Sequence, residues 1–252
     1  MVNQHVIEIC ANSVQSCIEA EKGGASRVEL CAAIPEGGTT PSYGEILMAR
    51  KSIDINLNVI IRPRSGDFLY SPLEVEVMKH DIATCKALGV DGVVFGMLTS
   101  DGNVDSDLCR ELLAQCGGMA VTFHRAFDVC RNPMIAIEEI IALGFSRILT
   151  SGQAATAYEG RSMISDLVKK ADNRIIIMPG CGINEDNINI IKEETSASEF
   201  HLSARHRVSS QMQYHKDGVS MGGIVNVEEF AVNQTSADRV KHAISNLDIA
   251  IR

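Results

Sequence analysis

The local motifs of several large enzyme and metal-binding classes are missing from this sequence. There is no Cys-x-x-Cys pair, which disfavours a zinc ribbon or a thioredoxin-like site. There is no His-x-His or His-Glu-x-x-His, which disfavours a zinc hydrolase. Residues 10–13 lack the glycine-rich turn of dinucleotide-binding folds, so we predict no nucleotide cofactor. No lysine stands beside Thr150 and Ser151, at the end of a predicted strand, which disfavours a Schiff-base aldolase.

Long apolar runs are missing as well. The first residues include His5 and Glu8, so we expect neither a secretory signal nor a membrane-spanning segment. The 32 acidic residues exceed the 23 basic ones, which gives a net charge of −9 and argues against nucleic-acid and anionic-membrane partners. We therefore predict a cytoplasmic protein whose eight cysteines are free thiols, because disulfides are rare in reducing compartments.

Short apolar runs alternate with helix-like segments along all 252 residues. A spacing of roughly 30 residues between strands suits one βα unit, and eight such units close a barrel at about 250 residues. The pattern therefore predicts the α/β class and a single-domain (β/α)8 TIM barrel over residues 1–252. The predicted strands are residues 6–10, 28–31, 57–61, 92–95, 120–123, 147–150, 174–178 and 199–202.

Capping residues place the intervening helices. Asn12 or Ser13 can cap the first helix, and the last is expected to begin near Ser236. A capping residue followed by proline, which is typical of a helix start, occurs at Thr40-Pro41, Ser71-Pro72 and Asn132-Pro133. Residues 205–223 are less regular, and we predict a loop or a lid at the barrel mouth there.

Charged side chains occupy positions that should face the barrel interior. Alternation along the strands places Glu8 and Glu29 on inner faces, where unpaired carboxylates are costly. Arg62 and Arg64 at the end of the third strand are the expected partners. Alternatively, these arginines clamp the carboxylate or phosphate group of a substrate, with Glu8 beside them and Glu29 as a catalytic group that moves a proton.

Two cysteines share those inner faces. Cys10 follows Glu8 and Cys31 follows Glu29 at the same spacing, so the two thiols should lie close together on neighbouring strands. Soft thiolate ligands select Cu(I), which makes this pair a candidate metal site. The alternative is two small buried side chains without a ligand.

The segment from Thr122 to Asp128 concentrates chemistry at the end of the fifth predicted strand. His124 is a candidate general base or metal ligand, Asp128 is expected to orient it or a bound water, and Arg125 is a candidate substrate-binding residue. His201, at the end of the eighth strand, is a further substrate-binding candidate.

Two serines and one loop complete the predicted site. Ser151 and Ser203 follow the sixth and eighth strands, and we expect both to contact substrate. Residues 178–183, Met-Pro-Gly-Cys-Gly-Ile, follow the seventh strand, where a glycine-rich loop can offer backbone N–H groups to a phosphate.

Several of these stretches together resemble the CutC family, which is named for copper homeostasis. The stretches are Glu8-Ile9-Cys10, Val28-Glu29-Leu30-Cys31, residues 36–42, Ile61-Arg62-Pro63-Arg64, residues 66–71, 122–128 and 149–152, Phe200-His201 and Ser203-Ala204. The resemblance implies a TIM barrel, a cytoplasmic location, self-association into a homo-oligomer, and a Cu(I) site at Cys10 and Cys31. Two hypotheses follow: a Cu(I)-binding protein, or an enzyme acting on a small anionic metabolite that bears phosphate or carboxylate.

Overall fold

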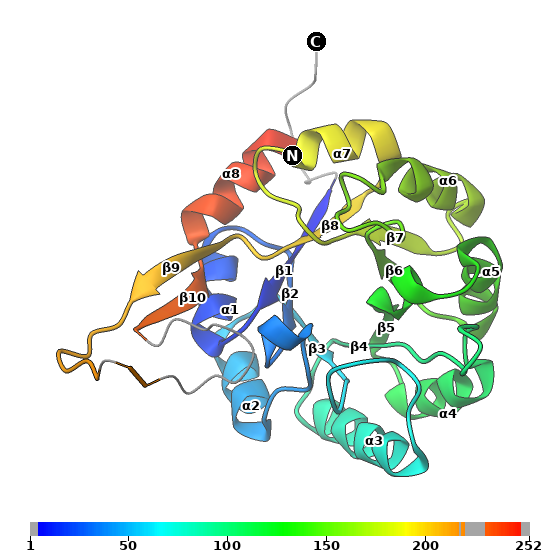
Figure 1. Cartoon of the computed structure of the whole chain (residues 1–252), viewed down its shortest axis with the longest axis horizontal. Coiled ribbons are helices and arrows are strands. Elements are labelled where there is room, and N and C mark those ends of the chain that lie inside the picture. Colours follow the sequence, from blue (N-terminus) through cyan, green and yellow to red (C-terminus); the bar gives the residue numbers. More distant parts are fainter. Residues whose placement is uncertain (1–4, 217, 220–229, 248–252) are drawn as a thin grey trace.

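Eight parallel strands close a barrel in the part of the chain that the computed structural model describes, residues 5–216, 218–219 and 230–247 (Figure 1). Neighbouring strands follow the chain order from β1 to β7, and β8 pairs with β1. A bridge between Gly180 and His201 links β7 to β8. The strands are β1 (Val6–Ala11), β2 (Arg27–Leu30), β3 (Asn56–Ile60), β4 (Gly92–Phe95), β5 (Ala120–Phe123), β6 (Arg147–Thr150), β7 (Ile176–Pro179) and β8 (Glu199–Leu202). The predicted barrel is confirmed, and all eight predicted strands overlap these elements.

Helices surround the barrel and cover its outer face. They are α1 (Val14–Lys22), α2 (Tyr43–Ser52), α3 (Pro72–Ala87), α4 (Ser106–Cys116), α5 (Pro133–Leu143), α6 (Arg161–Ala171), α7 (Ile188–Thr195) and α8 (Ala237–Leu247), with short 3-10 helices η1 (Ile34–Glu36) and η2 (Arg125–Val129). Isoleucine, leucine, valine and phenylalanine side chains between strands and helices form one continuous buried core. No helix within the described ranges is long and apolar enough to cross a membrane.

The caps explain where these helices begin. Ser13, Ser71 and Asn132 each accept a backbone N–H of the following turn, as predicted. The prediction at Thr40-Pro41 is wrong. Ser42 caps α2 instead, because it forms a reciprocal capping box with Glu45.

Residues 205–209, predicted to be part of a loop or lid, instead form strand β9 (Arg205–Ser209). Strand β9 pairs antiparallel with β10 (Ala231–Thr235), which comes much later in the sequence. Such non-local pairing leaves little local signal, since residues 205–209 lack an alternating apolar pattern. The hairpin extends from the barrel past α1 (Figure 1), and the Thr235 N–H donates to Ser16 on that helix. Residues 217 and 220–223 of the predicted segment lie outside the described ranges.

Candidate functional site

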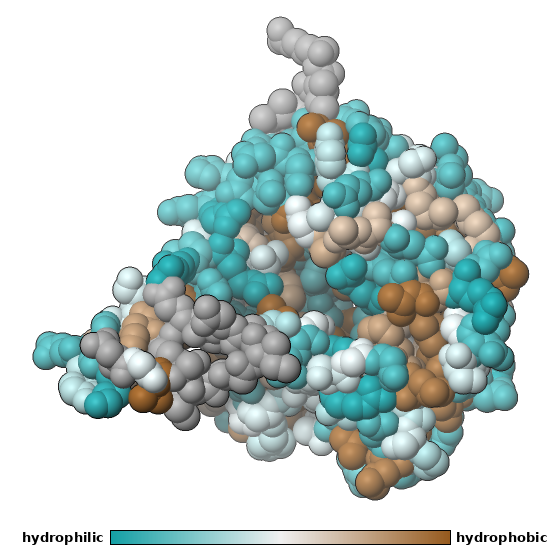
Figure 2. All heavy atoms as spheres, in the orientation of Figure 1, coloured by the Kyte–Doolittle hydropathy of each residue, from teal (hydrophilic) through white to brown (hydrophobic). Residues whose placement is uncertain are grey.

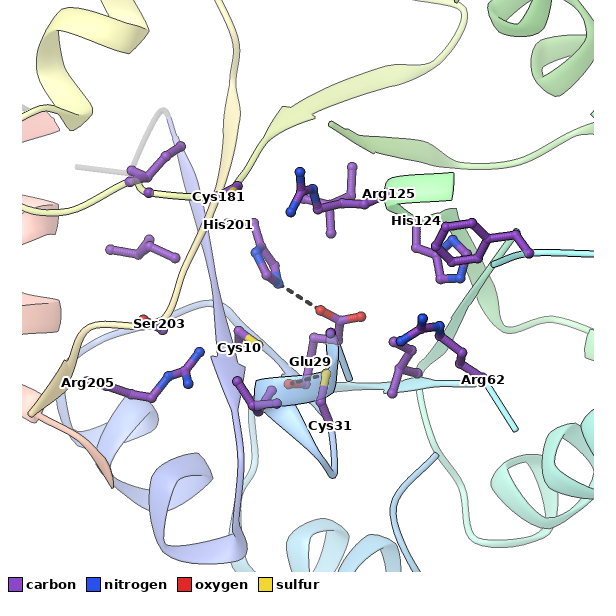
Figure 3. Close-up of a pocket in the computed structure, with 18 residues that line it drawn as sticks. Cys10, Glu29, Cys31, Arg62, His124, Arg125, Cys181, His201, Ser203 and Arg205 are labelled. Carbon is purple, nitrogen blue, oxygen red and sulfur yellow. Dashed lines mark hydrogen bonds and ion pairs between the residues drawn. The ribbon is translucent and has the colours of Figure 1, made fainter. Parts of the chain in front are cut away.

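A cavity of about 390 Å³ opens at the carboxyl ends of the strands. Its polar lining comes from six strands or the loops that follow them, and Figure 2 shows the hollow beside a mainly hydrophilic rim. Ile34, Ile60, Phe68, Leu149 and Ile183 contribute apolar walls. The polar residues of the lining are Cys10, Glu29, Cys31, Arg62, His124, Arg125, Cys181, His201, Ser203 and Arg205 (Figure 3).

Beneath this cavity the barrel interior holds a buried network of charges. Arg27 on β2 contacts Glu8 on β1 through its Nε and Glu199 on β8 through its Nη2. Arg147 on β6 reaches Glu199 at 3.1 Å, and Asn58 on β3 donates to Glu8 at 3.0 Å. Burial opposes ionisation of Glu8, but Arg27 outweighs it and lowers the pKa of that carboxyl. Glu8 therefore does not line the cavity but stabilises its floor.

Tight packing accompanies these charges. A Cβ at Gly92 would lie 2.2 Å from Asn58 Oδ1, and one at Gly180 would lie 2.5 Å from a Leu149 methyl group. The backbone oxygen of Ala120 would also lie 2.9 Å from a Cβ at Gly92, so glycine on β4 leaves room for the Asn58 amide. Gly180, just after β7, leaves room for Leu149 and for the His201 ring, whose Nδ1 would lie 3.2 Å from its Cβ.

Glu29 and His201 form an ion pair at the centre of the cavity floor (Figure 3). His201 Nε2 lies 2.7 Å from Glu29 Oε2 and 3.9 Å from Glu8 Oε1. Burial raises the pKa of Glu29 to about 6, although the hydrogen bond to His201 opposes the shift. Burial disfavours the charged form of His201, but its interactions with Cys10 and Glu29 prevail, and the pKa of His201 is raised well above its ordinary value. The pair can therefore hold or exchange a proton at the barrel mouth.

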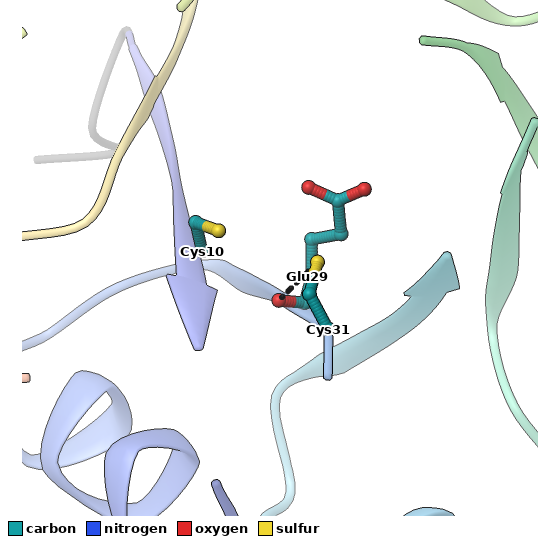
Figure 4. A group of neighbouring side chains, drawn as sticks. All are labelled: Cys10, Glu29 and Cys31. Carbon is teal, nitrogen blue, oxygen red and sulfur yellow. Dashed lines mark hydrogen bonds between the residues drawn. The ribbon is translucent and has the colours of Figure 1, made fainter. Parts of the chain in front are cut away.

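Cys10 and Cys31 lie side by side next to Glu29 (Figure 4). Their Sγ atoms and a Glu29 carboxylate oxygen all lie within 4.8 Å of one another. A hydrogen bond from Cys31 lowers the pKa of Cys10 well below its ordinary value, against the effect of burial, and His201 adds to the decrease. The same hydrogen bond and burial raise the pKa of Cys31. The two sulfur atoms thus lie close together, as the strand spacing predicts, and Cys10 is the more acidic of the two.

Arg62 and Arg64 do not pair with Glu8 and Glu29, which corrects the prediction from the sequence. The Arg62 guanidinium donates to the carbonyl oxygens of Glu36, Gly38 and Gly66 at 2.7–3.1 Å. Arg64 lies outside the cavity, where it binds Glu74 at 2.5 Å and Asp67 at 3.0 Å. Proline between them ends the strand, and the loop supplies closer acceptors than the barrel interior.

His124 lines the cavity as a neutral ring. Burial and the nearby Arg62 charge lower the pKa of His124 to about 3. Its Nδ1 accepts the Ala126 N–H at 3.3 Å, so the ring proton resides on Nε2. That Nε2 is buried and has no hydrogen-bond partner in the described part of the chain. An unpaired buried donor costs roughly 1–3 kcal/mol, which points to an acceptor that a ligand supplies.

Asp128 and Ser151 do not line the cavity, but both form hydrogen bonds with Arg125, which does. Asp128 accepts the N–H of Ser151 at 2.9 Å and Arg125 Nε at 2.7 Å. Ser151 Oγ accepts from Arg125 Nη2 at 3.1 Å. The prediction that Asp128 orients His124 is therefore replaced: Asp128 and Ser151 position Arg125, whose guanidinium lies at the cavity (Figure 3).

Several residues of the buried charge network and of the cavity lining were not predicted from the sequence. Arg27, Arg147 and Glu199 all stand at strand starts, and this repetition of charge at equivalent positions was the available signal. Arg205, just after the eighth strand, directs its guanidinium toward Cys10 in Figure 3. Its Nε is buried and unpaired within the described residues. Ser203 and two residues of the loop after β7, Cys181 and Gly182, also line the cavity.

The fold and the cavity define a TIM-barrel protein with a polar, arginine-rich site at the carboxyl ends of its strands. The chain belongs to the CutC family, whose pattern matches residues 5–206. It is 57% identical to a CutC family protein of Parabacteroides distasonis over 94% of this chain and 98% of that protein. It is 46% identical to the human protein named copper homeostasis protein cutC homolog, over 95% of this chain and 88% of that protein.

A solved structure agrees with the family assignment. A CutC protein from Streptococcus agalactiae superposes with a TM-score of 0.76 at 37% identity, over 79% of this chain and 98% of that chain.

Replacing Arg27 with methionine should destabilise the fold by about 3–5 kcal/mol, because it leaves Glu8 and Glu199 buried without their counter-charge. Urea denaturation measures the change. Arg174→Met is the matched control, since its ion pair with Glu138 is exposed to solvent and should contribute far less to stability. Equal effects of the two substitutions would show that the interior network does not stabilise the barrel.

Proposed function

We propose that this chain binds Cu(I) through Cys10 and Cys31 at the barrel mouth. The single observation that supports this most is the approach of both sulfur atoms to within 4.8 Å on adjacent strands, at the edge of an open cavity. Thiolate ligands suit Cu(I), and a lowered pKa at Cys10 supplies one thiolate before the metal arrives. The copper name of the human relative agrees with this proposal.

The surroundings of the thiols suit a site that is accessible yet protected. Only Cys10 and Cys181 among the eight cysteines are partly exposed, whereas Cys31 is buried and lines the cavity beside Cys10. Glu29 offers an oxygen next to both sulfurs and can receive the proton that Cys31 must lose. We further propose that the protein works in the reducing cytoplasm, where Cu(I) and free thiols persist.

Anaerobic titration of Cu(I) against a competing chelator tests the proposal. The parent chain should bind one Cu(I) tightly, and Cys10→Ser or Cys31→Ser should weaken binding at least about tenfold, or about 1.4 kcal/mol. Cys181→Ser is the matched control, because Cys181 is also half-buried and lines the same cavity outside the sulfur pair. If the double variant of Cys10 and Cys31 binds as tightly as the parent, the proposal fails.

A second candidate function is catalysis on a small anionic metabolite. The specific observation is the charge of the cavity wall: Arg62, Arg125 and Arg205 approach from three sides, and Glu29 is the only carboxylate in the described lining (Figure 3). Arginine recognises carboxylate and phosphate, and the Glu29–His201 pair between the arginines can move a proton.

Thermal unfolding with a panel of anionic metabolites tests this candidate. An anion present at about 100 times its Kd should stabilise the fold by about 2.7 kcal/mol, which corresponds to a Tm increase of roughly 5–10 °C. Neutral polyols of similar size are the control and should leave Tm unchanged. A panel in which carboxylates and phosphates behave like the polyols would eliminate the candidate.

Self-association also remains a proposal. Apolar side chains gather over the side of the molecule formed by α3 to α5 in Figure 2, and Leu73 and Val77 on α3 are 75% and 42% exposed. Such a surface suits contact with a second copy of the chain.

A further inference from the structure

Unpaired hydrogen-bond donors lie at two separate places on the cavity wall. One place holds Arg205 Nε, after β8, and the other holds His124 Nε2, after β5, together with Arg62 Nε, after β3. All three atoms are buried without a partner in the described ranges, and all three residues line the cavity. In Figure 3 Arg205 stands on one side of the Glu29–His201 pair, and His124 and Arg62 stand on the other. A ligand that satisfies donors on both sides must therefore carry two acceptor groups and span the floor of the cavity.

The side formed by the β7 and β8 loops suits a phosphoryl group. In TIM barrels the loops after the seventh and eighth strands frequently form the phosphate site. Here these loops bring Gly182, Ser203 and Arg205 to the cavity, so a backbone, a hydroxyl and a guanidinium group surround one volume. Gly182 has φ +75°, and a Cβ there would lie 3.0 Å from a Thr156 methyl group, so the backbone conformation of this loop favours glycine at position 182.

The opposite side suits a neutral oxygen. His124 contributes an uncharged ring whose Nε2–H can donate to a carbonyl oxygen without a charge of its own, as in isomerases that polarise a carbonyl with neutral histidine. The ring packs edge-on against Phe68 at 4.9 Å between centroids, which leaves it little freedom to turn away. The nearby Arg62 guanidinium is held by three backbone carbonyls and adds positive charge to this wall.

We propose that the cavity binds a small phosphate ester that carries a carbonyl group, with its phosphoryl group at Arg205 and Ser203 and its carbonyl oxygen at His124 Nε2. This proposal rests on the second candidate function and names its substrate class. The carbon skeleton between the two groups then lies above Glu29 and His201. A doubly charged phosphoryl group also fits a lining with three arginines and one carboxylate better than a single carboxylate does.

Isothermal titration of the full chain tests the proposal with three probes: inorganic phosphate, glycerol 3-phosphate and dihydroxyacetone phosphate. All three should bind, and dihydroxyacetone phosphate should bind most tightly, because it alone presents a carbonyl. Arg205→Gln should weaken all three about tenfold. Arg207→Gln is the matched control, since Arg207 lies on the same strand but is exposed and outside the cavity.

His124→Leu, which removes the Nε2–H donor, should weaken only dihydroxyacetone phosphate and leave inorganic phosphate unchanged. Because the ring is buried, this variant can fail to fold, and NMR of the His124 Nε2–H in the parent chain then serves instead. Its signal should move with dihydroxyacetone phosphate and stay in place with inorganic phosphate.

Three results would overturn the proposal. Arg205→Gln could bind phosphate as tightly as the parent, or the His124 signal could ignore dihydroxyacetone phosphate. Alternatively, dicarboxylates such as malate could bind while no phosphate does, which removes the phosphate class but leaves the second candidate function standing. If no anion of either class binds, both fall together.

Discussion

The contact between Arg27 and the two carboxylates of Glu8 and Glu199 is the constraint on which the rest of the site depends. TIM-barrel interiors are usually filled with branched apolar side chains, whereas this one buries two acids and two arginines below its mouth. Such charges are tolerated only when they are mutually compensated, so the strands β1, β2, β6 and β8 must keep their register. The network therefore acts as a rigid polar floor.

That floor determines the chemistry of the layer above it. Glu29 lies two residues beyond Arg27 and His201 two residues beyond Glu199, so the same inward faces carry both layers. Since Arg27 and Arg147 already neutralise the lower acids, His201 pairs mainly with Glu29. The hydrogen bond from Cys31 lowers the pKa of Cys10, the charged His201 adds to the decrease, and three arginines lie around the opening. The same arrangement of side chains therefore supports copper binding by two thiols and anion binding by arginines, at adjacent parts of one cavity.

The sequence predicted the barrel well because strands and caps are local signals. Alternation also correctly placed Cys10, Glu29 and Cys31 together, since parallel strands with known order leave few choices. The partners of the charged side chains were harder to predict. Arg62 is bound by loop carbonyls and Arg64 by Glu74, and these contacts depend on how residues 36–38 and 66–74 fold back. Asp128 likewise binds a turn 22 or more residues away. The β9–β10 hairpin and the position of Arg205 depend on non-local pairing, which residue periodicity does not encode.

The central claim is that the barrel mouth holds a charged His201 beside Glu29 and a neutral His124 across the cavity. Nitrogen NMR of the histidine rings as a function of pH measures both states in one experiment. We expect His201 to remain an imidazolium above the ordinary histidine pKa of about 6.5, and His124 to stay neutral down to about pH 4 with its proton on Nε2. A His201 ring that is neutral at pH 7, or a His124 ring that titrates near pH 6.5, would contradict this account.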